Sequence, residues 1–233
     1  PLLVAYEAFR DEFPDGKRKT LDDFVRQLGE AHVRATRKST HFTNRYGKHV
    51  RLAVICGRIL DREEWTEEGR RGVKRFVRHA LYGDGTSRDL KRRDTLTYHN
   101  SALRPPLQIA ILSGPERAFE LYTWENKRGG SLKKSVEYVV PYALGEKTRE
   151  EWTNSKIGLD KRRAEAGIAK YQPGSLYNPK HALELMELAT YFDGDLVRVV
   201  RHLNASDAER FLSWQVLVNE AVREVQNGSE RLP

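Results

Sequence analysis

The chain has 233 residues, of which 39% are hydrophobic and 32% are charged, a balance that is typical of a folded globular protein and excludes a disordered chain. No stretch reaches the about 20 consecutive apolar residues of a membrane helix, so we expect no membrane span. The formal net charge of +8 indicates either a solvated basic surface or an acidic partner, such as nucleic acid, an anionic membrane or an acidic polysaccharide.

Helical spacing dominates the first half of the chain, where apolar residues recur at intervals of three and four positions. Thr20 and Asp23 have the spacing of an N-terminal cap for the second helix. Arg104-Pro-Pro is expected to open the fifth helix, and Ser113-Gly-Pro to end it. The single cysteine, Cys56, lies in an apolar run and is expected to be a small buried hydrophobe. The expected helices lie around residues 2–6, 21–32, 50–57, 73–80 and 103–111.

The second half of the chain predicts more helices and almost no strands. Residues 131–144 keep helical spacing, and runs of β-branched residues with alternating polarity do not occur. Capping signals mark further helix starts. One of these helices would carry the acidic pair at 150–151 on its surface. These starts are Thr148-x-x-Glu151, Asn178-Pro179 and Ser206-x-x-Glu209.

The order of the elements predicts an all-α fold. Helices that alternate with short loops rich in Gly, Pro and Asp favour stacked antiparallel hairpins, as found in a bundle, a solenoid or an α/α toroid. The length suits one large domain or two small ones, and we expect a single helical domain over residues 1–233.

The first polar cluster is Thr43-Asn44-Arg45-Tyr46-Gly47-Lys48-His49, directly before an apolar helix. It combines an amide, a guanidinium, a phenol, an ammonium and an imidazole. One interpretation is a helix start that Asn44 caps, with the remaining side chains in solvent. The other interpretation is one side of a polar site.

The second polar cluster runs from Arg88 to Asn100 and places four cations before Tyr98-His99-Asn100. One interpretation is a basic loop that Asn100 caps. Arginines beside aromatic residues can also bind nucleic acid, but the charge is local and no nucleic-acid motif is present. We therefore expect no nucleic-acid partner.

The chain lacks the sequence motifs of several common classes of enzyme. The chain has no GxGxxG, GxxxxGK[ST], HExxH, CxxC or GxSxG pattern, and its 7 histidines are scattered, so we expect no cofactor and no metal site. The Tyr, His, Asn and Arg side chains that remain suit elimination across a uronic acid. A base must remove the C5 proton, which becomes acidic enough only when the neighbouring carboxylate is neutralised. A Tyr or a His can act as that base, or as the acid for the glycosidic oxygen.

The second cluster resembles a known family. Arg92-Arg-Asp-Thr-Leu-Thr-Tyr-His-Asn-Ser-Ala-Leu is similar to the R-D-x-L-x-Y-H segment of the alginate lyase superfamily, which includes helical alginate and glucuronan lyases. Asn44-Arg-Tyr-Gly-Lys-His resembles the Asn-rich segment that opens an earlier helix in that family. Weaker similarity continues through residues 129–148 to Tyr171-x-Pro-Gly and Asn178-Pro, so that the resemblance spans most of residues 21–192.

The resemblance implies an incomplete α/α toroid with a cleft across one end. It also implies β-elimination, which leaves an unsaturated uronate at the new non-reducing end. Tyr98 would be the base, the acid or both, and Asn44 would help to neutralise the carboxylate. An arginine would hold that carboxylate, with Arg93 preferred over Lys91 and Arg92.

This chain departs from the family directly after the Asn, where many members have His or Trp and this chain has Arg45. Either Arg45 or His49, one helical turn further on, is therefore expected to complete the neutralisation. The expected catalytic residues are Tyr98, His49, Asn44 and Arg93, and the expected substrate-binding residues are Arg45, Tyr46, Lys91, Arg92, His99 and Trp124.

The favoured hypothesis is a lyase that cleaves an acidic polysaccharide of the alginate or polyglucuronate type. The alternatives are a non-catalytic relative that binds acidic glycans and, from another class, a helical nucleic-acid-binding protein. The chain is shorter than a typical family member, so we expect it to lack the N-terminal hairpins, which an upstream segment or a second chain would supply. The resemblance implies a secreted or periplasmic location.

Overall fold

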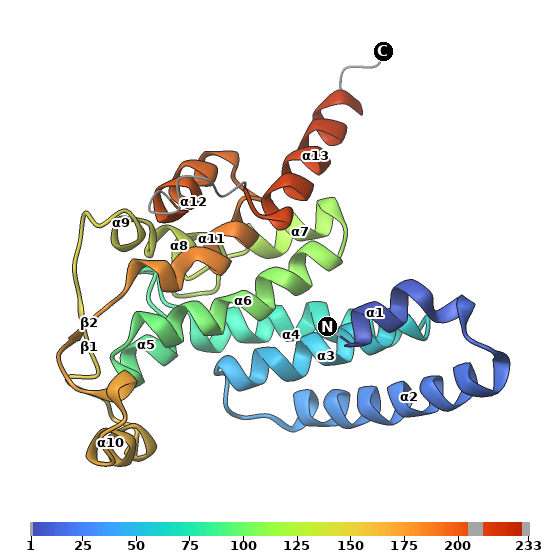
Figure 1. Ribbon diagram of the computed structural model, residues 1–233, viewed down its shortest axis with the longest axis horizontal. Coiled ribbons are helices and arrows are strands. Elements are labelled where there is room, and N and C mark those ends of the chain that lie inside the picture. Colours follow the sequence, from blue (N-terminus) through green and yellow to red (C-terminus); the bar gives the residue numbers. More distant parts are fainter. Residues whose placement is uncertain (1, 205–211, 230–233) are drawn as a thin grey trace.

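A computed structural model describes residues 2–204 and 212–229, with side chains to residue 225, and 72% of the described residues are helical (Figure 1). Apart from one isolated bridge, strand pairing in these ranges is limited to β1 (Glu150–Glu151) and β2 (Ser175–Leu176), which are antiparallel. The all-α class is confirmed, and the incomplete toroid stays a prediction. The helices are α1 (Leu2–Phe9), α2 (Asp15–Lys38), α3 (Asn44–Ile59), α4 (Glu63–Ala80), α5 (Arg88–Arg93), α6 (Leu96–Leu112), α7 (Pro115–Thr123), α8 (Leu132–Glu137), α9 (Val140–Ala143), α10 (Gly158–Glu165), α11 (Leu183–Ala189), α12 (Val197–Asn204) and α13 (Trp214–Ser229), with 3-10 helices η1 (Arg10–Glu12), η2 (Ala169–Tyr171), η3 (Pro179–Ala182) and η4 (Gly194–Leu196).

Helix α3 lies at the centre of the N-terminal half, with α1, α2, α4 and α6 packed around it. Figure 1 shows α2, α3, α4 and α6 running back and forth, so that successive long helices are antiparallel. Val50 and Val54 of α3 enter the largest hydrophobic core, whereas Ala53 and Cys56 enter a smaller core against α2. Cys56 is fully buried, as predicted, and burial raises the pKa of its thiol to about 11.

Close contact between α3 and α4 depends on glycine at two positions of α4. A Cβ atom on Gly69 would overlap the side chain of Val54, which is 1% exposed. Gly72, one turn further on, meets Val50 in a similar way. Protein interiors are close-packed, so neither valine has free space into which it can move.

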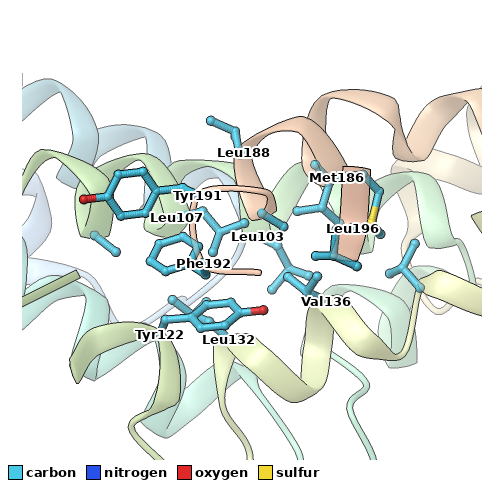
Figure 2. Close-up of a cluster of buried hydrophobic side chains, with 14 of the residues drawn as sticks. Leu103, Leu107, Tyr122, Leu132, Val136, Met186, Leu188, Tyr191, Phe192 and Leu196 are labelled. Carbon is cyan, nitrogen blue, oxygen red and sulfur yellow. The ribbon is translucent and has the colours of Figure 1, made fainter. Parts of the chain in front are cut away.

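The largest core joins α6 to the C-terminal helices (Figure 2). Leu103 and Leu107 of α6 are fully buried, and Met186 of α11 packs with them. The rings of Tyr122 and Phe192 stack with a centroid distance of 4.2 Å and an interplanar angle of 12°. These apolar contacts connect the N-terminal hairpins to the last third of the chain, since burial of apolar area is the main stabilising term.

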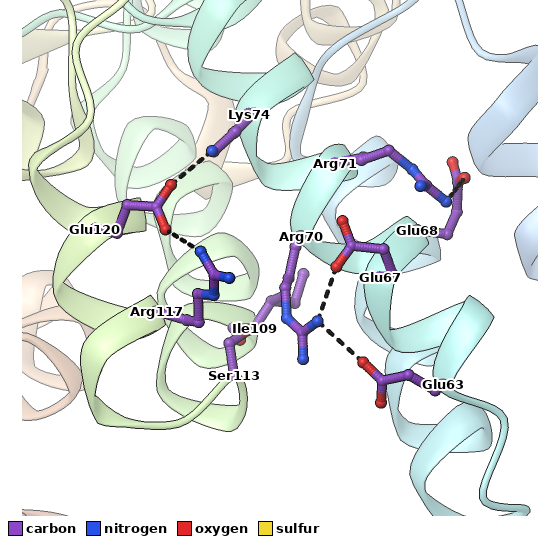
Figure 3. Close-up of polar contacts among 10 residues, drawn as sticks. All are labelled: Glu63, Glu67, Glu68, Arg70, Arg71, Lys74, Ile109, Ser113, Arg117 and Glu120. Atoms are coloured by element: carbon purple, nitrogen blue, oxygen red, sulfur yellow. Dashed lines mark hydrogen bonds and ion pairs between the residues drawn. The ribbon is translucent and has the colours of Figure 1, made fainter.

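Ion pairs connect α4 to α7 at the surface (Figure 3). Lys74 contacts Glu120 at 2.7 Å, and Arg117 contacts the same carboxylate at 2.9 Å. Within α4, Arg70 pairs with both Glu63 and Glu67. Exposed pairs of this kind each stabilise a protein by at most about 1 kcal/mol, so they neutralise charge more than they hold the fold together.

Two predicted helix starts are wrong because the helices begin earlier than their apolar pattern does. Helix α2 begins at Asp15, so Thr20 lies inside it and donates a hydrogen bond to the carbonyl of Gly16. Helix α6 begins at Leu96, where the side chain of Thr95 accepts a hydrogen bond from the Thr97 amide. The two prolines at 105–106 therefore lie within α6.

The second half contains two further corrections. Residues 131–144 form α8 and α9 in place of one helix. Thr148 and Glu151 do not cap a helix, because Glu150–Glu151 is strand β1. Glu151 is 4% exposed and its carboxylate accepts three hydrogen bonds from Thr95 and Thr97. Asn178 caps η3 through the amide of Lys180, and the predicted cap at Ser206 lies outside the described residues.

The contact between α3 and α4 generates a stability prediction. Gly69→Ala should lower the free energy of unfolding by about 1–3 kcal/mol, because the added methyl group overpacks the contact with Val54. Gly16→Ala is the matched control, since open space surrounds Gly16 near the start of α2 and the change should stabilise by up to about 1 kcal/mol. Urea unfolding of both variants measures the difference, and equal stability of the two variants would contradict the close packing.

Candidate active site

A cavity of about 660 Å³ opens where the end of α2, the start of α3, α5 and α10 meet. Figure 1 shows the α3 start, α5 and α10 at the same end of the molecule. Both polar clusters of the sequence contribute to its lining, as the resemblance implies for a cleft at one end. Six of the ten predicted site residues line the cavity with accessible side chains: Asn44, Arg45, His49, Arg92, Arg93 and Tyr98.

The cavity is strongly basic. Five of its cations form no ion pair with a carboxylate in the described part of the chain: Lys38, Arg45, Lys48, Arg92 and Arg163. The one acidic side chain among the described lining residues is Asp89, which is 4% exposed. Burial raises the pKa of Asp89 to about 6, against the opposing effect of the Asn44 amide and of nearby arginines. Unpaired cations around a hollow favour the binding of an anion.

Asn44 is held at the cavity by its backbone. Its amide donates a hydrogen bond to Oδ2 of Asp89 at 2.8 Å, which connects the first turn of α3 to α5. The predicted capping role of Asn44 is wrong, since Asn44 is the first residue of the helix and Thr43 occupies the cap position without a side-chain bond. The Asn44 side chain is therefore not needed for the helix start, and it lines the cavity.

His49 lies one turn further along α3 and contacts a histidine of α2. Nδ1 of His49 and Nδ1 of His32 are 2.8 Å apart, so one nitrogen donates and the other accepts. Burial, and then the proximity of His49, lower the pKa of His32. With Nδ1 engaged in this way, Nε2 is the ring nitrogen of His49 that stays available to a ligand.

Tyr98 lies in the first turn of α6 and lines the cavity. The guanidinium of Arg93 lies 4.0 Å from the centre of the Tyr98 ring, and Trp152 meets the ring edge-on at a centroid distance of 5.6 Å. Arg93 also donates to Oδ1 of Asp160 at 2.7 Å, and Asp160 is 2% exposed. Arg93 is therefore engaged within the protein, whereas its neighbour Arg92 is exposed and unpaired.

Four predicted substrate-binding residues lie elsewhere or are buried. Lys91 points away from the cavity, pairs with Asp84 and lies 4.0 Å from the ring of Tyr82. Trp124 lines a separate hollow beside Arg128.

The other two residues, Tyr46 and His99, are packed inside the protein. Tyr46 is 2% exposed, and its hydroxyl donates to the carbonyl of Gly72 and accepts from Arg75. His99 is fully buried between Ser87 and Ser135. A side chain without solvent contact cannot reach a polymer, so the predicted substrate contact of His99 is wrong.

The residues that the sequence-based prediction missed come mainly from α2 and from α10 with its following loop. Lys38 ends α2, and Arg163 of α10 lines the same cavity. Arg163 donates to the hydroxyl of Tyr171 at 2.8 Å, and Tyr171 packs against Trp152. No motif marks these positions, although the basic run at 161–163 is visible in the sequence.

Among residues 2–204 and 212–229, no three His, Cys, Asp or Glu side chains converge as a metal site requires. None of the helices described in those ranges combines the length and the apolar character needed to cross a bilayer.

The fold and the cavity define an all-helical protein with a basic, tyrosine-containing site at one end. The alginate lyase family model matches residues 5–149, which is more than half of the 233 residues and includes Asn44, His49, Arg93 and Tyr98. The chain therefore belongs to the alginate lyase family, and its general class is that of a polysaccharide lyase. No curated protein and no solved structure matches the chain. The resemblance noted beyond residue 149 stays a prediction.

The burial of His99 generates a pH prediction. Nε2–H donates to the Ser135 carbonyl, and Nδ1 accepts from the Ser87 hydroxyl, so the ring is held neutral. Burial lowers the pKa of His99 to about 4, below the usual value of 6.5. On acidification the unfolded chain binds this proton first, so His99 should lower the free energy of unfolding progressively between about pH 6.5 and pH 4, and by roughly 3 kcal/mol at most.

Chemical denaturation as a function of pH tests this contribution. His99→Gln should remove it, so the difference in unfolding free energy between wild type and variant should shrink toward pH 4. The control His202→Gln changes an exposed histidine of α12 and should keep the wild-type pH dependence. A His99→Gln profile that runs parallel to wild type would show that His99 does not titrate as its burial requires.

Proposed function

We propose that the protein cleaves an acidic, uronate-containing polysaccharide by β-elimination in the basic cavity. The observation that carries the proposal is the presence of Tyr98, His49 and Asn44 in one cavity with unpaired cations. A polymer with a carboxylate on each sugar matches that charge, and both general acid–base chemistry and charge neutralisation have side chains available.

Neutralisation of the uronate carboxylate is the first requirement. In this proposal Arg92 holds the carboxylate, because its guanidinium faces the cavity without a partner. Arg93, the arginine preferred from the sequence, instead donates one hydrogen bond to Asp160 and lies against the Tyr98 ring. Asn44 and Arg45 complete the neutralisation, since the start of α3 also directs its positive dipole end toward the cavity.

Proton transfer is the second requirement. A base removes the C5 proton, the electron pair forms the C4–C5 double bond, and the C4–O bond breaks. The leaving glycosidic oxygen then takes up one proton, so that no water is consumed. Tyr98 can act as base, as acid or as both, and Nε2 of His49 is the alternative base.

Incubation with polymannuronate, polyguluronate and polyglucuronate tests the activity, with ultraviolet absorbance of the unsaturated product as the readout. Binding of these polymers without product would favour the non-catalytic glycan-binding alternative. Binding of duplex DNA with a steep salt dependence, and no affinity for any uronate polymer, would favour the nucleic-acid alternative and contradict the proposal.

The role of Tyr98 generates a mutational prediction. Tyr98→Phe should lower turnover by at least about a hundredfold, because it removes the proton-transfer group and keeps the ring against Arg93 and Trp152. The free energy of unfolding should change by no more than about 1 kcal/mol. Tyr82→Phe is the control, since Tyr82 also lies under cations but outside the cavity. Near wild-type turnover of Tyr98→Phe would move the proton transfer to His49.

The adjacent cations of α5 generate a second mutational prediction. Arg92→Gln should lower kcat/KM by about tenfold or more, since it removes a charge-assisted hydrogen bond to the substrate carboxylate. Lys91→Gln removes the neighbouring charge on the other side of α5 and should stay close to wild type. Equal losses in the two variants would indicate a general effect of net charge and no specific carboxylate contact at Arg92.

A further inference from the structure

A second hollow of about 550 Å³, the Trp124 hollow, lies where the end of α4 meets the loop that follows α7. Trp124 lines it together with three cations, Arg78, Lys127 and Arg128. The Trp124 hollow shares no lining residue with the cavity that contains Tyr98, and the proposed elimination uses none of its side chains. It is therefore a separate place at which a ligand can bind.

The three cations of the Trp124 hollow have no carboxylate partner. In the described part of the chain, no ion pair involves Arg78, Lys127 or Arg128. The one acidic side chain among the described lining residues is Glu125, which pairs with Lys134 at 2.8 Å, so its charge is already balanced. The charge that remains at the hollow is positive, which favours an anionic ligand.

The loop of residues 124–130 is held in place by Asn126. The side chain of Asn126 is 7% exposed; it donates to the Leu81 carbonyl at 3.0 Å and accepts from the Arg128 amide at 2.8 Å. A Cβ atom on Gly130 would overlap the backbone of Leu81, so the loop packs directly on the chain that leaves α4. The side chains that line the hollow thus project from a fixed backbone, which lowers the entropic cost of binding.

An aromatic ring and guanidinium groups lie together in the Trp124 hollow. Arg128 donates to the Arg78 carbonyl at 2.9 Å, and its guanidinium lies 4.5 Å from the centre of the Tyr82 ring. Trp124 is half-buried, packs against the largest core on one side and lines the hollow on the other. An indole offers an apolar face to the C–H groups of a sugar, and a guanidinium binds a carboxylate. A uronate sugar carries both of these features.

The loop between α2 and α3 connects the cavity to the Trp124 hollow. His41 lines the cavity, and the next residue, Phe42, stacks on His79 with a centroid distance of 4.4 Å and an interplanar angle of 19°. His79 follows Arg78 in the last turn of α4, and Arg78 lines the hollow. A polymer that leaves the cavity over Phe42 and His79 therefore reaches the hollow.

We propose that the Trp124 hollow is a second binding site for an acidic polysaccharide, at which a uronate sugar stacks on Trp124 and its carboxylate binds Arg78 and Arg128. This inference rests on the proposed function for the class of ligand and adds a site outside the cavity. Two sites on one polymer raise its apparent affinity without a new contact in the cavity, because the second binding event is intramolecular. A short oligosaccharide that fills only the cavity gains nothing from the hollow.

Affinity electrophoresis in gels that contain polymannuronate, polyguluronate or polyglucuronate tests the site, with Tyr98→Phe as the background that limits cleavage. Adding Arg78→Gln or Trp124→Ala should weaken retention by the polymer about tenfold, since one of two linked sites is lost. The matched control, Arg198→Gln, removes an exposed cation of α12 that lines neither site and should be retained like the background. Unchanged retention in both hollow variants, or equal losses in Arg78→Gln and Arg198→Gln, would overturn the inference.

The length of the substrate gives a second arm. In the otherwise wild-type protein, Trp124→Ala should raise KM for a long polymer about tenfold, keep kcat within about twofold and leave KM for a short oligosaccharide unchanged. Trp124 contacts the largest core, so thermal unfolding checks that this variant is folded, and Arg78→Gln, which changes an exposed side chain, should show the same dependence on length. An equal rise in KM for short and long substrates would place the effect in the cavity and overturn the inference.

Binding and cleavage separate this inference from the proposed function. Weaker polymer retention in the hollow variants, with no unsaturated product from wild type, would retain the second site and reject the lyase. Product formation, with retention and KM equal in wild type and hollow variants, would retain the lyase and reject the second site. Loss of duplex DNA binding in the hollow variants, with binding of the uronate polymers unchanged, would also overturn the inference.

Discussion

The guanidinium of Arg93 lies between a buried carboxylate and an aromatic ring, at 2.7 Å from Asp160 Oδ1 and 4.0 Å from the centre of Tyr98. Asp160 is the only buried residue of α10, so this ion pair, and no apolar face, attaches α10 to α5. A buried ion pair gains little net stability, because both charges lose their hydration, but it fixes geometry, since breaking it leaves an uncompensated charge. Together with the hydrogen bond from the Lys156 amide to the Arg92 carbonyl at 2.8 Å, this ion pair holds α10 beside α5.

The ion pair between Arg93 and Asp160 determines which cations of the cavity remain unpaired. The charge of Arg93 is already balanced by Asp160, so Arg93 attracts a substrate carboxylate less strongly than an unpaired cation does. The unpaired cations Arg92, Arg45 and Lys48 have no such balancing carboxylate in the described part of the chain. The adjacent arginines of α5 thus divide two tasks, one holding the wall of the cavity and the other facing into it.

The sequence was sufficient to predict the all-α class and the meeting of the two polar clusters, because apolar periodicity and local clusters are properties of short segments. It was not sufficient to separate His99 from Tyr98, since adjacent residues at a helix start point in different directions and only tertiary packing decides which is buried. Helix starts failed for a related reason: the first turns of α2 are polar and exposed, so they carry no apolar signal. Arg163 and Tyr171 were missed because Arg93 and Asp160, which bring them to Tyr98, are 67 positions apart in the chain.

The two interpretations of the net charge of +8 can be compared on the protein's own surface. Three cations of α4 and α7 are paired: Arg70, Lys74 and Arg117 each have a carboxylate within 3.0 Å (Figure 3). Ion pairs of this kind are what a solvated basic surface is expected to show. Unpaired cations that lie close together repel one another, so their clustering is unfavourable. Around the cavity, by contrast, such cations converge, and the one acidic group among the described lining residues is a buried carboxyl with a raised pKa. An anion bound in the cavity would relieve that repulsion, and the arrangement therefore supports the acidic ligand proposed for the site that contains Tyr98.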